Sequence, residues 1–221
     1  GEDQKLYNEQ INAALKLLEK KPRKAVYYSF VLLEEGKMST RKGNIVLLED
    51  FMAEALKKAG GELKQRYKKI DTKAAKIIGY GSLKYAILKV SPEKNVIFNW
   101  QQALNFEGET APYIQYAYAR ISSIIKKHKK ALPKTANFSL LDKKEEIELI
   151  KKLSAFPQIA EKVSVELRPN IIANYAYELA KQFNEFYHIH NILKEKEEIK
   201  KARLLLAKSV QQTLKNSLNL L

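Results

Sequence analysis

The chain has 221 residues, 45% of them hydrophobic and 29% charged, a composition that suits one large or two small globular domains. It contains no cysteine, which excludes a disulfide framework, a thiolate metal site and a cysteine nucleophile. The formal net charge of +15 favours a polyanionic partner, although a lysine-rich solvated surface would give the same value.

The first half of the sequence mixes predicted helices with two predicted strands. Amphipathic spacing and helix-start signals predict helices over residues 5–19, 49–60 and 72–90 and from residue 100. Runs of β-branched and aromatic residues predict strands over residues 25–33 and 96–98. Gly60-Gly61 is expected to end the second helix. No apolar run approaches the ~18 residues of a membrane span, so we expect no membrane partner.

The second half has almost purely helical periodicity. Apolar residues recur every three or four positions in four segments, residues 112–130, 142–163, 169–194 and 196–220. The stripe of the third segment comprises Ile172, Tyr175, Leu179, Phe183, Phe186, Ile189 and Leu193. Such stripes bury one another in a bundle. We therefore expect a mainly α fold, in which a small α/β part is followed by an α-helical bundle.

A cationic loop after the first predicted strand, residues 36–44, is the sharpest local feature and is called the signature loop below. It places three cations, Lys37, Arg41 and Lys42, between Gly36 and Gly43. Lysine ammonium groups are mobile charges for phosphate, and such a site stabilises the charge that develops on a transferring phosphoryl group. The spacing differs from that of a P-loop. Composition alone equally allows a solvated basic turn.

The helix predicted over residues 112–130 carries a second candidate site. Beside its core stripe, one sector about 80° wide holds Tyr113, Tyr116, Arg120, Ser123 and Lys127. Aromatic rings beside cations stack the unpaired bases of RNA loops, at ~1–3 kcal/mol per base. Tyrosines that merely pack at the edge of a bundle, with their hydroxyls in water, would show the same pattern.

A second aromatic cluster, near residue 186, is predicted to lie mainly in the hydrophobic core. Phe183 and Phe186 lie on the apolar stripe with His190, whereas Tyr187 lies beside the stripe and is the member expected to reach RNA. His188 and His190 point to different faces of a helix, so we expect no metal site from them.

The order of the residues adds a family resemblance. Lys37-Met38-Ser39-Thr40-Arg41 resembles the Lys-Met-Ser-Lys-Ser signature of class I aminoacyl-tRNA synthetases, and the string up to Asp50 looks like its arginyl form. Phe106-Glu107-Gly108-Glu109-Thr110-Ala111-Pro112-Tyr113, continuing to Arg120, resembles the start of the DALR anticodon-binding domain of arginyl-tRNA synthetases. Residues 1–4 and the helix after them look like the last part of the catalytic domain of that family.

The resemblance implies a catalytic remnant at residues 1–107 and an anticodon-binding domain at residues 108–221 of a cytoplasmic arginine–tRNA ligase. That enzyme joins arginine to its tRNA through an arginyl-adenylate, using ATP as its Mg²⁺ salt. By position in the motifs, the implied catalytic residues are Lys37, Ser39, Arg41 and Lys42. The implied ATP-binding residues are Asp3, Gln4, Gly36 and Met38. The implied tRNA-binding residues are Tyr113, Tyr116, Arg120, Lys127 and Tyr187.

The sequence departs from the family pattern in two ways. Thr40 stands where the general signature has its second lysine, so Arg41, Lys42 or another lysine would supply that charge. The His-Ile-Gly-His element of class I enzymes is absent, so we expect this chain alone to be inactive and to need an N-terminal catalytic part in cis or in trans. The alternatives are a stand-alone RNA-binding helical adaptor without catalysis and a basic interaction domain without an RNA role.

Overall fold

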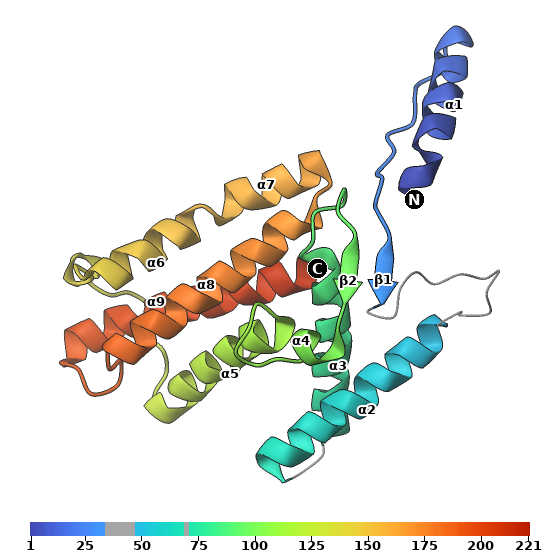
Figure 1. The fold of residues 1–221 in the computed structure, drawn as a ribbon. Coiled ribbons are helices and arrows are strands. Elements are labelled where there is room, and N and C mark those ends of the chain that lie inside the picture. The colour runs from blue at the N-terminus through green and yellow to red at the C-terminus, as the bar shows by residue number, and fades with distance from the viewer. Residues whose placement is uncertain (34–46, 69–70) are drawn as a thin grey trace.

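The structure, a computed structural model, describes residues 1–33, 47–68 and 71–221, which form a small α/β part and a helical bundle (Figure 1). The signature loop lies outside the described residues. The predicted fold class, mainly α with a small α/β remnant before a bundle, is confirmed. Within the described ranges, no helix is long and apolar enough to cross a membrane.

The α/β part is built around a parallel pair of short strands. Its elements are η1 (Glu2–Gln4), α1 (Lys5–Leu17), β1 (Val31–Leu33), α2 (Leu48–Tyr67), α3 (Thr72–Leu88), β2 (Val96–Phe98) and α4 (Trp100–Ala103). Val31 pairs with Val96 in the parallel ladder. Helix α1 stands apart from the rest of the molecule in Figure 1, and none of its residues is buried.

Two sequence predictions for this part were wrong. Helix α2 does not stop at Gly60-Gly61 but continues to Tyr67, because it packs against α3 and has buried residues on both sides of the glycine pair, such as Ala59 and Leu63. Tertiary packing there outweighs the ~1 kcal/mol that each helical glycine costs. The strand expected over residues 25–33 is confined to Val31–Leu33, because the partner strand β2 has three residues.

The bundle follows β2 and α4. Its elements are α5 (Ala111–His128), η3 (Phe138–Leu140), α6 (Lys144–Ser154), α7 (Phe156–Glu166), α8 (Pro169–Ile189) and α9 (Glu197–Leu220). Helix α8 packs against α5, α6, α7 and α9, and Figure 1 shows it running through the bundle. Ile121 of α5, Phe183 of α8 and Leu214 of α9 are fully buried in the shared core. The predicted helical stripes are therefore the faces that these helices bury.

Several helix boundaries in the bundle differ from those that the periodicity predicts. The single helix expected over residues 142–163 is two helices, α6 and α7, and Pro157 lies in the first turn of α7, where its missing N–H costs nothing. Helix α8 ends at Ile189, because the backbone of His190 is extended. Ile189 is 59% exposed and does not belong to the buried stripe. Leu193 reaches the core from the following loop and not from the helix.

Helix α3 joins the two parts. Leu83 packs with Phe98 in the small α/β core, whereas Tyr85 is buried in the bundle core and donates its hydroxyl to the carbonyl of Ala173, 3.2 Å away. Burial raises the pKa of Tyr85 well above its usual value. On the same helix, a Cβ at Gly81 would lie 2.5 Å from Nε2 of Gln115. That amide donates to a carbonyl of α3, which fixes α5 against it.

A surface ion pair also joins the parts. Arg168, the residue before α8, donates to the carboxylate of Glu93, and the hydroxyl of Ser91 donates to the same carboxylate. These two hydrogen bonds lower the pKa of Glu93 to about 2. Because the folded-state pKa lies below the unfolded value, this contribution to stability is present above pH ~4.5 and is lost as the pH falls toward 2.

Gly79 allows the backbones of α2 and α3 to touch. A Cβ at this position would lie 2.7 Å from the backbone oxygen of Ala55, whereas one at Gly61 would meet nothing within 4 Å. We predict that Gly79→Ala lowers the free energy of unfolding by ~1–3 kcal/mol, because the helices must separate. Gly61→Ala is the matched control and should raise it by ~0.5–1 kcal/mol. Denaturant unfolding of both variants tests this, and equal shifts would contradict it.

Candidate nucleic-acid interface

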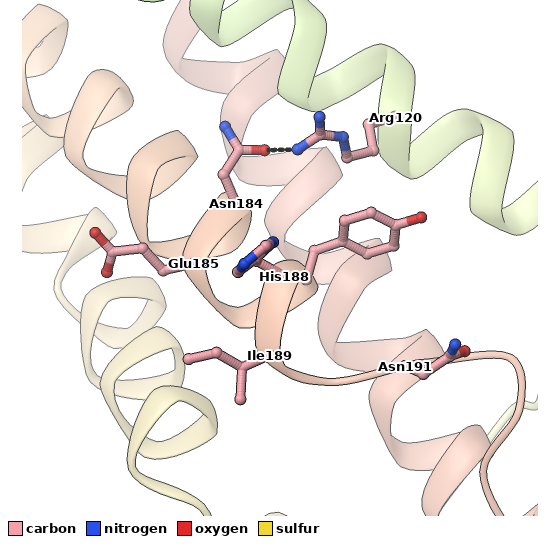
Figure 2. Close-up of a pocket in the computed structure, with 7 residues that line it drawn as sticks. Arg120, Asn184, Glu185, His188, Ile189 and Asn191 are labelled. Carbon is pink, nitrogen blue, oxygen red and sulfur yellow. Dashed lines mark hydrogen bonds between the residues drawn. The ribbon is translucent and has the colours of Figure 1, made fainter.

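Arg120 forms the centre of a cationic and aromatic surface between α5 and α8. Its guanidinium carbon lies 4.7 Å from the ring centroid of Tyr116 and 5.3 Å from that of Tyr187. Its Nη1 donates to Oδ1 of Asn184 at 2.6 Å, the hydrogen bond drawn in Figure 2. The guanidinium thus contacts two rings and donates to an amide, and we call this surface the Arg120 face.

Two hollows open on the Arg120 face. The first, of about 620 Å³, is drawn in Figure 2 and lies over the C-terminal end of α8, with Asn184 and His188 in its wall. The second, of about 450 Å³, lies between α5 and the loop after α8. Arg120, Tyr187 and Asn191 line both hollows. Because the two hollows share these three residues, one extended ligand could contact both hollows.

The tyrosines of this face are open to solvent on one side and fixed on the other. Tyr116 is 44% exposed and Tyr187 is 39% exposed. The Tyr187 ring stacks on buried Phe183, with a centroid distance of 6.2 Å and an interplanar angle of 18°. Packing against the core sets the orientation of a ring that a base could stack on.

The structure brings together most of the residues predicted to bind tRNA. Tyr116, Arg120, Lys127 and Tyr187 line the second hollow, as does Ser123, which the periodicity placed in the same sector. Tyr113 lies elsewhere: its ring packs against the bundle core, 5.3 Å from that of Tyr177.

Of the residues predicted for the ATP site, the structure describes Asp3 and Gln4 alone. Gly36, Lys37, Met38, Ser39, Arg41 and Lys42 are outside the described residues. Asp3 and Gln4 are exposed in η1, where Nε2 of Gln4 donates to Oδ2 of Asp3 at 3.1 Å. The roles of these eight residues remain predictions.

Sequence reasoning missed two contributors to the face. Tyr67, the last residue of α2, lines the second hollow, but α2 was expected to end at Gly60-Gly61. The signal that could have found it is an aromatic residue directly after basic Lys64 and Arg66. Asn184 was missed because an asparagine on a helix carries no sequence signal for a partner on another helix.

A buried ionic network supports the loop beside the two hollows. Arg203 of α9 is 3% exposed and donates to Glu146 at 2.7 Å and to Glu195 at 2.9 Å. Its Nη2 is 3.4 Å from Nδ1 of His190, whose Nε2 is 3.0 Å from the carboxylate of Glu145. The hydrogen bond with His190 lowers the pKa of Glu145. Through His190 and Glu195, Arg203 holds both ends of the loop that carries Asn191.

Comparison with known families agrees with this arrangement. Residues 1–100 match the family described as tRNA synthetases class I (R), catalytic domain, and residues 114–221 match the DALR anticodon binding domain. The chain belongs to the arginyl-tRNA synthetase family.

Its relatives are longer proteins. The arginine–tRNA ligase of Methanocella arvoryzae is 44% identical across the whole chain, and that of Methanocaldococcus jannaschii is 42% identical. The chain spans 40% and 39% of their respective lengths. The solved arginyl-tRNA synthetase of Thermus thermophilus matches 96% of this chain, which spans 37% of that one, with a TM-score of 0.87 and 28% identity.

Arg203 gives a stability prediction. Arg203→Met leaves the fully buried Glu146 carboxylate without its cation, so we expect the free energy of unfolding to fall by ~3–5 kcal/mol. Adding Glu146→Gln should recover most of this loss, because the charge is then gone and an oxygen remains to accept from the Lys143 amide. Denaturant unfolding is the measurement. Lys201→Ala, which breaks an exposed ion pair, is the control and should cost ~1 kcal/mol or less.

Proposed function

We propose that the Arg120 face binds the anticodon loop of a tRNA for arginine. The observation that carries this proposal is the contact of Arg120 with the exposed rings of Tyr116 and Tyr187, within the part of the chain that matches the DALR domain. Unpaired bases of an RNA loop stack on aromatic and guanidinium planes. Because Asn184 occupies one of the five donors of Arg120, the others remain to select base edges or phosphates.

Lysines next to the face supply the phosphate contacts in this proposal. Helix α5 ends at His128, and its last turn and the residues after it carry Lys126, Lys127, Lys129 and Lys130. Lys130 lies close enough to Glu197, at the start of α9, to lower the pKa of that carboxyl, after the larger effect of Lys200. The end of α5 therefore lies near the start of α9, and its four lysines are called the basic border. Each single-strand phosphate contact adds ~0.7 to the log–log salt slope.

The α/β part contributes to the ATP site in this proposal. The signature loop closes over ATP and its Mg²⁺, and Lys37, Ser39, Arg41 and Lys42 stabilise the charge of the pyrophosphate leaving group during formation of arginyl-adenylate. Asp3 and Gln4 offer an acceptor and a donor to the ribose. Residues 1–107 then form the end of the catalytic domain, and residues 108–221 form the anticodon-binding domain.

Exposed leucines in and after α1 support a further part of this proposal, an N-terminal catalytic part. Leu6 and Leu17 of α1 and Leu18, the residue that follows the helix, are 67%, 87% and 68% exposed. Exposed apolar surface of this kind is typical of an interface. Together with the greater length of the relatives, it supports an N-terminal catalytic part, in cis or in trans, that covers α1 and restores aminoacylation by a cytoplasmic ligase.

Arg120 tests the anticodon proposal. Arg120→Ala should weaken binding of an anticodon stem-loop from a tRNA for arginine by about 10- to 150-fold, because charge-assisted hydrogen bonds contribute ~1.5–3 kcal/mol. Fluorescence anisotropy with the labelled stem-loop measures the affinity. Arg23→Ala, an exposed arginine on the segment between α1 and β1, is the control and should change little. Equal affinity of the unaltered chain for a stem-loop with a changed anticodon would refute recognition.

Lys37 distinguishes the ligase from the adaptor. In a protein that includes the N-terminal catalytic part, Lys37→Ala should slow ATP–pyrophosphate exchange by about 10²–10³-fold, because a preorganised charge at the leaving group is lost. Binding of the anticodon stem-loop should not change, since the Arg120 face is intact. Unchanged exchange would favour the stand-alone RNA-binding adaptor.

A further inference from the structure

Tyr67 extends the Arg120 face onto a helix of the α/β part. It is the last residue of α2, it is 59% exposed, and it lines the second hollow together with Tyr116 and Arg120 of α5. The next residue, Lys68, has left-handed backbone torsions and ends the helix. A large aromatic ring thus stands at a helix end, in a hollow whose other walls belong to the bundle.

The packing of α2 fixes the place of this ring. Helix α2 touches α3 through the close approach of Ala55 and Gly79, and α3 is tied to α5 by the amide of Gln115. On the other side of the helix end, the guanidinium of Arg66 lies 4.4 Å from the ring centroid of Phe106. Arg66 is therefore engaged away from the hollow, and Tyr67 is the side chain that α2 contributes there.

The lining of the second hollow defines the chemistry of its ligand. Three phenol rings and two cations line it, from Tyr67, Tyr116, Tyr187, Arg120 and Lys127. None of the described residues that line it is acidic, whereas the first hollow includes Glu185. Rings offer stacking surfaces and cations neutralise a phosphate, so the lining suits an unpaired nucleotide. A volume of about 450 Å³ falls in the usual range for small-ligand sites.

We propose that Tyr67 is an RNA-binding residue that stacks on one unpaired base of the bound loop in the second hollow. The proposal rests on the proposed function of the Arg120 face and extends it to the α/β part of the chain. One nucleotide then contacts α2 and α5 at once.

The experiment pairs variants of the full chain with abasic RNAs. Tyr67→Ala should bind the anticodon stem-loop about 5- to 150-fold more weakly, and Tyr67→Phe should bind nearly as well as the unaltered chain, because stacking needs the ring and not the hydroxyl. Stem-loops with a single abasic site at each loop position then locate the base. At one position, the unaltered chain and Tyr67→Ala should bind with equal affinity, because the stacking partner is already missing.

Controls separate stacking from other causes. Tyr7→Ala removes a tyrosine of 60% exposure from α1 and should leave the affinity unchanged. The salt slope of Tyr67→Ala should match that of the unaltered chain, whereas Lys127→Ala should lower it by ~0.7. If Tyr67→Ala binds as tightly as the unaltered chain, or loses the same factor with every abasic RNA, base stacking on Tyr67 is refuted. If Arg120→Ala still weakens binding in that case, the proposed function stands without it. Failure of the unaltered chain to bind the intact stem-loop would remove both.

Discussion

The arrangement of the molecule depends on one buried tyrosine. The hydroxyl of Tyr85 sits in the bundle core and must find a partner there, because an unpaired buried hydroxyl costs ~1–3 kcal/mol. The carbonyl of Ala173 on α8 provides that partner, so this hydrogen bond helps to fix α3 on the bundle. Since α2 is packed backbone to backbone on α3 at Gly79, the docking of α3 on the bundle also positions Tyr67 relative to Arg120. The candidate interface is therefore a consequence of the core.

The Arg120 face is ordered before any ligand arrives. Tyr187 is stacked on a buried ring, and Arg120 contacts two rings and donates to an amide. Ordering a long, rotamer-rich side chain at binding costs ~0.5–1.5 kcal/mol, and much of that cost is met here during folding. The four lysines at the end of α5, Lys126, Lys127, Lys129 and Lys130, are by contrast exposed. From this contrast we expect the rings and the arginine to select bases. The lysines should add salt-dependent attraction to phosphates.

Periodicity gave the right answer wherever packing follows a helical repeat. It identified the bundle, the buried stripe of α5 and the sector that holds Tyr116, Arg120 and Lys127. It failed where a long-range contact decides a boundary. Gly60-Gly61 resembles a helix stop locally, whereas the packing of α2 against α3 continues the helix past it. Because the predicted helix ended too early, the sequence did not identify Tyr67 as part of the interface. The position of Tyr113 against Tyr177 likewise depends on a neighbouring helix, which a pattern along one helix does not contain.

The ionic network around Arg203 is better explained by geometry than by stability. Replacing a buried ion pair with apolar residues of similar volume is often neutral or stabilising, so a network that joins Arg203, Glu146 and Glu195 is a poor way to gain free energy of folding. What it provides is direction: hydrogen bonds hold His190 and Glu195 on either side of the loop that carries Asn191. An apolar contact is non-directional and would let this loop slide. Because Asn191 lines both hollows, the network sets the shape of the space between α5 and α8 that an RNA loop would have to enter.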